Sequence, residues 1–79
     1  MTNLEKYEKV FCEVFETSKD KLENLKFQDI PAWDSVGHMS LVAALENEFD
    51  IMMDADDIIN LSSFKKGQEI LRNTYSIDL

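Results

Sequence analysis

One serine of this chain is placed where its hydroxyl could take part in phosphate chemistry. Ser35 follows Asp34 at the predicted start of a helix that runs to Phe49 and Asp50. The first turn of a helix has backbone N–H groups without partners and the positive end of the helix dipole, and both favour a negatively charged group. A phosphate on the Ser35 hydroxyl would suit this place. The alternative is that Ser35 only caps the helix, a role worth about 1 kcal/mol.

The net charge of the chain is concentrated around this serine. The 79 residues carry 16 acids against 8 bases, which gives a net charge of −8. Residues 1–26 and 65–79 together carry eight acids and eight bases, so the whole net charge lies in residues 27–64, which contain no Lys or Arg. An acidic surface repels nucleic acid and anionic membranes and attracts basic partners. We therefore expect protein partners with basic surfaces, and neither nucleic-acid binding nor membrane insertion.

Residues in this part of the sequence could also suggest a catalytic site or a calcium site. His38 lies one helical turn after Ser35, as a base beside a nucleophile would, but no glycine-rich oxyanion loop accompanies the pair. A calcium loop starting at Asp54 fails, because Ile59 stands where an EF-hand needs glycine and Lys65 where it needs glutamate. A chain this short also has room for only one small core. We interpret His38 as a residue at the edge of the core, and we predict neither a catalytic centre nor a metal site.

The first half of the chain predicts one amphipathic helix and a long connection. Thr2 and Glu5 form a capping box, which predicts a helix over residues 3–17. The apolar stripe of this helix is expected at Leu4, Tyr7, Phe11 and Val14, flanked by Val10 and Phe15. Residues 18–33 lose the helical period, and Pro31 favours an extended backbone. We expect four apolar side chains to pin this connection to the core: Leu22, Leu25, Phe27 and Ile30.

The helix that Asp34 or Ser35 caps has two apolar faces. At about 100° per residue, one arc contains the residues expected to face the core: His38, Leu41, Val42, Leu45 and Phe49. A neighbouring arc contains Val36, Met39 and Ala43, with Glu46 one turn further along. The second arc predicts an exposed apolar strip beside Ser35.

Two more helices complete the predicted fold. Asp54 begins a short one of about two turns, and Ser62 or Ser63 caps a last one that ends near Asn73. Three longer helices and one short helix, with a long loop between the first two, make a small all-α four-helix bundle. We predict that residues 1–79 form a single domain.

The stretch around Ser35 resembles the acyl carrier protein family. The sequence reads WDSVGH over residues 33–38 and LVAALENEFDI over residues 41–51. In that family an Asp-Ser-Leu motif opens the second helix, a run ending in Glu-Phe-Asp closes it, and a short acidic helix follows. The resemblance covers nearly the whole chain. Four positions depart from the usual pattern and look more like a specialised carrier than a housekeeping one: Trp33, Gly37, His38 and Ser40.

The resemblance implies a role for several residues. Ser35 matches the serine that carries 4′-phosphopantetheine, which a separate phosphopantetheinyl transferase takes from coenzyme A, and Asp34 matches the motif acid. Four positions match those that face the transferase and other partners: Val36, Met39, Ala43 and Glu46. The acidic residues of the short third helix are expected to add to this docking surface: Asp54, Asp56 and Asp57.

The resemblance also implies a function. We expect a monomeric, non-enzymatic acyl carrier that presents a thioester-bound acyl group to the enzymes of fatty-acid, polyketide or specialised acyl biosynthesis. One alternative is an aminoacyl or peptidyl carrier, and another, of a different class, is an unmodified acidic helical module that binds a partner helix. Cys12 is the only cysteine, and the first residues lack a long apolar run, so we expect a cytoplasmic protein.

Overall fold

The computed structural model describes residues 1–79 and is all-helical. Four α-helices follow one another: α1 (Asn3–Phe15), α2 (Ser35–Phe49), α3 (Ala55–Asn60) and α4 (Phe64–Tyr75). A single 3-10 turn, η1 (Lys19–Lys21), interrupts the connection between α1 and α2. The fold contains no strand, and an isolated β-bridge joins Lys26 to Ser63. The all-α class, the number of helices and the long loop after the first helix are as the sequence predicts.

The helix boundaries follow from local capping. At the start of α1, Glu5 N–H donates to the Thr2 hydroxyl at 3.1 Å while Thr2 N–H donates to the Glu5 carboxylate at 2.9 Å. The helix ends at Phe15, two residues before the predicted end, because Glu16 adopts the left-handed conformation (φ 52°) that stops a helix. In the same way, α4 passes Asn73 and stops where Ser76 turns left-handed.

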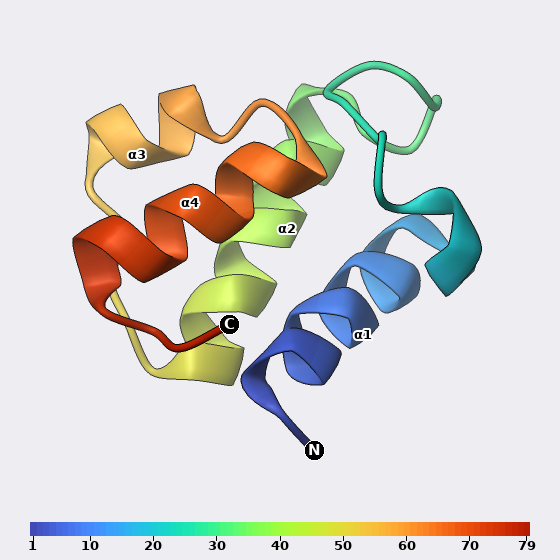
Figure 1. The fold of residues 1–79 in the computed structure, drawn as a ribbon. Helices are drawn as coiled ribbons and strands as arrows, with labels where there is room; N and C mark the ends of the chain where they lie inside the picture. Colours follow the sequence, from blue (N-terminus) through green and yellow to red (C-terminus); the bar gives the residue numbers. More distant parts are fainter.

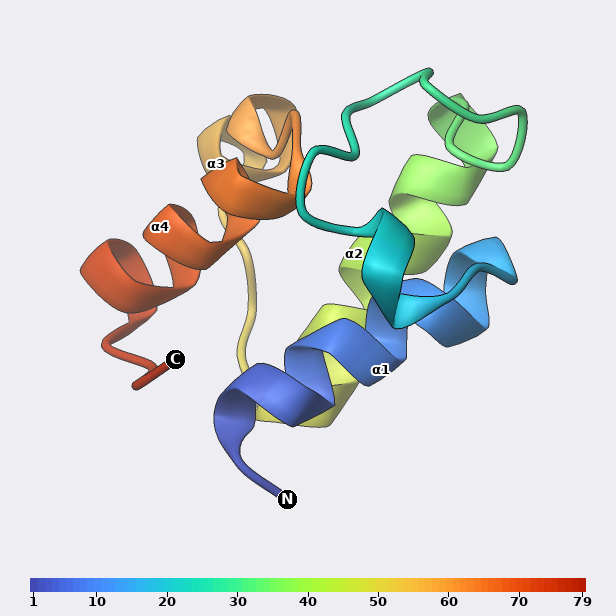
Figure 2. The same ribbon diagram turned by 45° about the vertical axis from the view of Figure 1, so that its right-hand side comes forward.

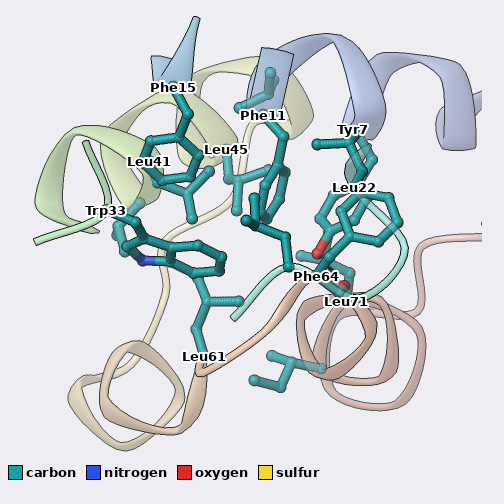
Figure 3. Close-up of a cluster of buried hydrophobic side chains, with 14 of the residues drawn as sticks. Tyr7, Phe11, Phe15, Leu22, Trp33, Leu41, Leu45, Leu61, Phe64 and Leu71 are labelled. Carbon is teal, nitrogen blue, oxygen red and sulfur yellow. Dashed lines mark hydrogen bonds between the residues drawn. The ribbon is translucent and has the colours of Figure 1, made fainter. Parts of the chain in front are cut away.

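The core is built mainly from aromatic and aliphatic side chains, and no polar or charged residue is buried. Figure 3 shows Phe11 and Phe15 of α1 directed toward the indole of Trp33. Phe15 stacks on Trp33 with ring centroids 5.0 Å apart, and Phe11 meets it edge-on at 5.6 Å. Trp33 itself is completely buried. The connection between the first two helices therefore supplies the largest side chain of the core.

The apolar stripe of α1 differs from the one predicted. Val10 and Phe15, expected on its flanks, are buried, whereas Leu4 is 36% exposed and Val14 is only half-buried. Periodicity places all of these residues on one broad face. The packing of α1 against Trp33 and α2 selects which part of that face is covered.

The long connection is pinned as the sequence predicts. Leu22 and Leu25 are buried, and Phe27 and Ile30 are half-buried against the core. The backbone is also held, because Phe27 N–H donates to the Ser62 carbonyl and Phe64 N–H donates to the Leu25 carbonyl, each at 2.9 Å. These bonds join the connection to the start of α4.

Helix α3 lies at one side of the molecule. In Figures 1 and 2, α1 and α3 lie on opposite sides, and the two chain termini lie at the same end. The long connection passes over the other end, where α2 begins. None of the six residues of α3 is buried. This helix therefore depends on contacts at its edges.

A buried hydrogen bond joins α1 to α4. The Tyr7 hydroxyl donates to the Phe64 carbonyl at 2.6 Å, and burial raises the pKa of this phenol, which therefore stays a donor. Gly67 lies directly against it: an added Cβ would come 2.1 Å from the Tyr7 oxygen. The start of α4 is thus fitted closely to one side chain of α1.

We predict that Tyr7→Phe lowers the free energy of unfolding by about 2 kcal/mol, because it leaves the Phe64 carbonyl without its buried donor. Denaturant titration followed by circular dichroism measures the change. The control is Thr74→Val, which removes an exposed hydroxyl of α4 and should cost less than about 1 kcal/mol. Equal losses for the two variants would contradict this prediction.

Candidate functional site

At the start of α2, the residue that caps the helix is Asp34 and not Ser35. Asp34 is the N-cap, and its carboxylate accepts from Gly37 N–H at 2.8 Å, while its carbonyl accepts from His38 N–H at 2.8 Å. Ser35 is the first residue of the helix and is exposed. Of the two caps that the sequence allows, the structure uses Asp34. The Ser35 hydroxyl is therefore not required for the cap.

Gly37 lets the connection lie close to this first turn. A Cβ built on Gly37 would come 1.8 Å from the carbonyl oxygen of Ala32, which is a backbone atom and cannot turn aside. Only glycine fits this contact without a shift of the backbone. Because Gly37 has no side chain, the segment before Asp34 and Ser35 can lie against the first turn of α2.

His38 lies half-buried at the edge of the core, where the sequence predicts it. Its Nδ1 accepts from the indole N–H of Trp33 at 3.0 Å, and its Nε2 lies 2.8 Å from the Ile58 carbonyl of α3. The two rings are nearly parallel, at 14°, with their centroids 6.3 Å apart. Both ring nitrogens are engaged, so neither is free to take a proton from Ser35.

The predicted apolar strip of α2 is exposed. Val36 is 76% exposed and Met39 53% exposed, and Ala43 one turn later is also exposed. Glu46 differs from these three, because it is half-buried and its carboxylate accepts from Met53 N–H at 2.9 Å. Glu46 thus holds the turn after α2 in addition to any contact with a partner.

The acids at α3 are not equivalent. Asp54 and Asp56 have exposed side chains. Asp57 is half-buried and accepts from the Tyr75 hydroxyl at 2.7 Å, and the Tyr75 hydroxyl oxygen in turn accepts from Asp54 N–H at 2.9 Å. Burial, together with the bond to Asp57, raises the pKa of the Tyr75 phenol. Of the three predicted docking acids, Asp54 and Asp56 therefore have free carboxylates.

Two exposed apolar residues near these acids were not predicted as site residues. Met52 is 87% exposed and Ile59 76% exposed. Ile59 also lines a shallow groove of about 190 Å³ with Ile58, Leu61 and His38. A short helix such as α3 gives a weak periodic signal, which is why the sequence does not identify Ile59 as exposed.

Two further features were looked for in the structure: a metal-binding cluster and a membrane-spanning helix. No group of three or more His, Cys, Asp or Glu side chains lies close enough together to hold a metal ion. None of the helices has the length and apolar character needed to cross a bilayer.

Comparison with known proteins finds no family model, no curated protein and no solved structure that matches this chain. The resemblance of residues 33–51 to acyl carrier proteins is therefore an interpretation of the motif.

We predict that Gly37→Ala destabilises the protein by about 2 kcal/mol, because the new methyl group meets the Ala32 carbonyl. In an ordinary helix position the same change would stabilise by up to about 1 kcal/mol, so the sign alone is informative. Thermal and denaturant unfolding measure it, with exposed Ser40→Ala on the same helix as the control. A stabilised Gly37→Ala protein would show that the close contact is absent in solution.

Proposed function

We propose that this protein is an acyl carrier whose Ser35 hydroxyl receives a 4′-phosphopantetheine arm. The observation that carries the proposal is the division of roles at the start of α2. Asp34 caps the helix, and Ser35 stands exposed on its first turn with a hydroxyl that the cap does not use. If Ser35 were only a cap, its side chain would accept the bond that Asp34 takes.

The residues at this helix end suit a phosphate ester. On modification, Ser35 Oγ would form a bond to the phosphorus next to the pantetheine, and the diphosphate bond of coenzyme A would break. Adenosine 3′,5′-bisphosphate would leave, and the hydroxyl proton would go to a base of the transferase. The dipole of α2 favours a negative phosphate at this end. When bound, the arm supplies a thiol that holds an acyl group as a thioester. The exposure of Ser35 fits the bulk of the arm and the access that a transferase needs.

The surface beside Ser35 supports recognition by partner enzymes. Val36, Met39 and Ala43 offer an apolar strip, and the carboxylates of Asp54 and Asp56 are free to attract basic residues. Apolar contact gives a place to dock, while opposite charge speeds the encounter. We infer that the four helices form the small bundle of a carrier domain. The acidic region would then lie on the side that partners approach.

A direct test is incubation with coenzyme A and a phosphopantetheinyl transferase of broad specificity, followed by intact-mass measurement. We expect one phosphopantetheinyl group per chain, because one hydroxyl is suitably placed. Ser35→Ala should abolish the adduct, and the matched control Ser40→Ala, five residues along the same helix, should leave it unchanged. An adduct that survives Ser35→Ala, or no adduct on the wild-type chain, would refute the assignment.

Loading of the thiol distinguishes one alternative, and the adduct itself distinguishes the other. An aminoacyl or peptidyl carrier gives the same adduct, but an amino-acid-adenylating enzyme, and no acyl-loading enzyme, would then charge the thiol. An unmodified helical module would give no adduct and would keep its partner binding after Ser35→Ala.

We also predict that reversing the charge of one exposed acidic residue slows modification by the transferase. Asp56→Lys should reduce the rate of modification about threefold at low salt, with the effect shrinking as added salt screens the charge. Asp56 is preferable to Glu46 for this test because the Glu46 carboxylate holds the backbone of Met53. The control is Glu13→Lys, an equal charge change at an exposed position of α1. Equal effects of the two reversals would show that overall charge matters and the position of Asp56 does not.

A further inference from the structure

The first turn of α3 is bonded by a side chain from another helix. Asp54 is the N-cap of α3, but its carboxylate makes no capping bond. The hydroxyl of Tyr75, at the end of α4, accepts from Asp54 N–H at 2.9 Å and donates to the Asp57 carboxylate at 2.7 Å. A backbone N–H can only donate, so the hydroxyl proton is directed to Asp57. One hydroxyl thus joins the N-cap of α3 to the third residue of the helix.

The start of α1 shows which bond this hydroxyl replaces. There the N-cap is Thr2, and the carboxylate of Glu5, the third residue of the helix, accepts directly from Thr2 N–H at 2.9 Å. Asp57 holds the same place in α3, but its side chain is one methylene shorter than that of the glutamate or glutamine usual in a capping box. The Tyr75 hydroxyl therefore completes in α3 a bond that Glu5 makes alone in α1.

Helix α3 has little else to hold its first turn. It has six residues, none of them is buried, and a helix this short is not stable by itself. In Figure 1 its start lies beside the C-terminal end of α4, from which Tyr75 comes. The contact of His38 with the Ile58 carbonyl lies in the second half of the helix. Segments with few buried contacts open most often, so we expect the Tyr75 bridge to control how often α3 opens.

We propose that Tyr75 is a positioning residue for the surface that partners bind: its hydroxyl holds the first turn of α3 while Asp54 and Asp56 stay unbonded. In an ordinary N-cap the aspartate side chain accepts from the first turn, as Asp34 does in α2. In α3 the Asp54 carboxylate has no such bond, and Asp54 and Asp56 are both exposed. Both carboxylates are then available to the basic residues of a partner.

The first test is amide hydrogen exchange by NMR on the unmodified full chain, at one pH and one temperature. The probes are the Ile58 and Leu61 amides, which donate to the carbonyls of the N-cap and the third residue of α3, and the internal reference is the Gly67 amide of α4. Tyr75→Phe keeps the ring and removes both bonds of the hydroxyl. We expect the two α3 probes to open about tenfold more often in this variant, with Gly67 unchanged.

Two further variants separate capping of α3 from a general loss of stability. Tyr7→Phe removes a hydroxyl that bonds the start of α4, so it should speed exchange at Gly67 and leave the α3 probes unchanged. Asp57→Glu, added to Tyr75→Phe, provides a carboxylate long enough to reach Asp54 N–H directly, and it should restore most of the protection of α3. Unchanged α3 exchange in Tyr75→Phe, or no recovery in the double variant, would overturn the proposal.

The consequence for docking rests on the proposed function, whereas the capping of α3 does not. A short exposed helix opens at low cost, so a tenfold rise in opening makes the open form a sizeable fraction of the molecules. The measurement is the rate of modification by a phosphopantetheinyl transferase with coenzyme A, with the chain as the varied substrate at low salt. We expect Tyr75→Phe to raise KM about twofold with kcat unchanged, and the added Asp57→Glu to reverse the rise.

The two measurements fail in distinguishable ways. Faster α3 exchange in Tyr75→Phe with an unchanged KM would overturn the role in docking. If the wild-type chain is not modified at all, the proposed function fails, and the exchange result still decides whether Tyr75 caps α3.

Discussion

The burial of Trp33 is the constraint on which the rest of this structure depends. Its indole fills the space between α1 and α2, stacks on Phe15 and is completely excluded from solvent. A side chain of this size contributes a large part of the apolar area that so small a domain can bury. Because Trp33 directly precedes Asp34 and Ser35, its anchoring also fixes where α2 begins. The position of the candidate site thus follows from core packing.

The buried indole also needs a hydrogen-bond acceptor, and this requirement affects the residues around the site. The N–H of Trp33 needs an acceptor, since an unpaired buried donor costs about 1–3 kcal/mol. His38 supplies it, and the remaining ring nitrogen of His38 then reaches α3. The buried indole of Trp33 is in this way connected to α3, which has no buried residue. A proposed carrier gains from such an arrangement, because the surface beside Ser35 is held in place without burying the serine.

Several polar groups of the acidic region have structural roles that their charge does not reveal. Glu46 holds the turn after α2 through Met53 N–H, and Asp57 is bonded by Tyr75. Asp54 and Asp56 keep free carboxylates. An acidic surface of this kind is therefore partly a scaffold and partly available for partners. The distinction depends on residues such as Tyr75 that are distant in sequence.

The sequence by itself determined the four helices and the capping box of the first, because capping boxes and helical periodicity are local and need no tertiary contact. It also placed Ser35 at a helix start, with an exposed apolar strip beside it and acids nearby. It did not determine which face of α1 is covered, that Trp33 fills the core, or that His38 joins Trp33 to α3. Those features arise where segments distant in the chain meet, and packing selects among faces that periodicity leaves equivalent. The assignment of the cap to Asp34, which leaves the Ser35 hydroxyl free, was likewise decided only by the folded backbone.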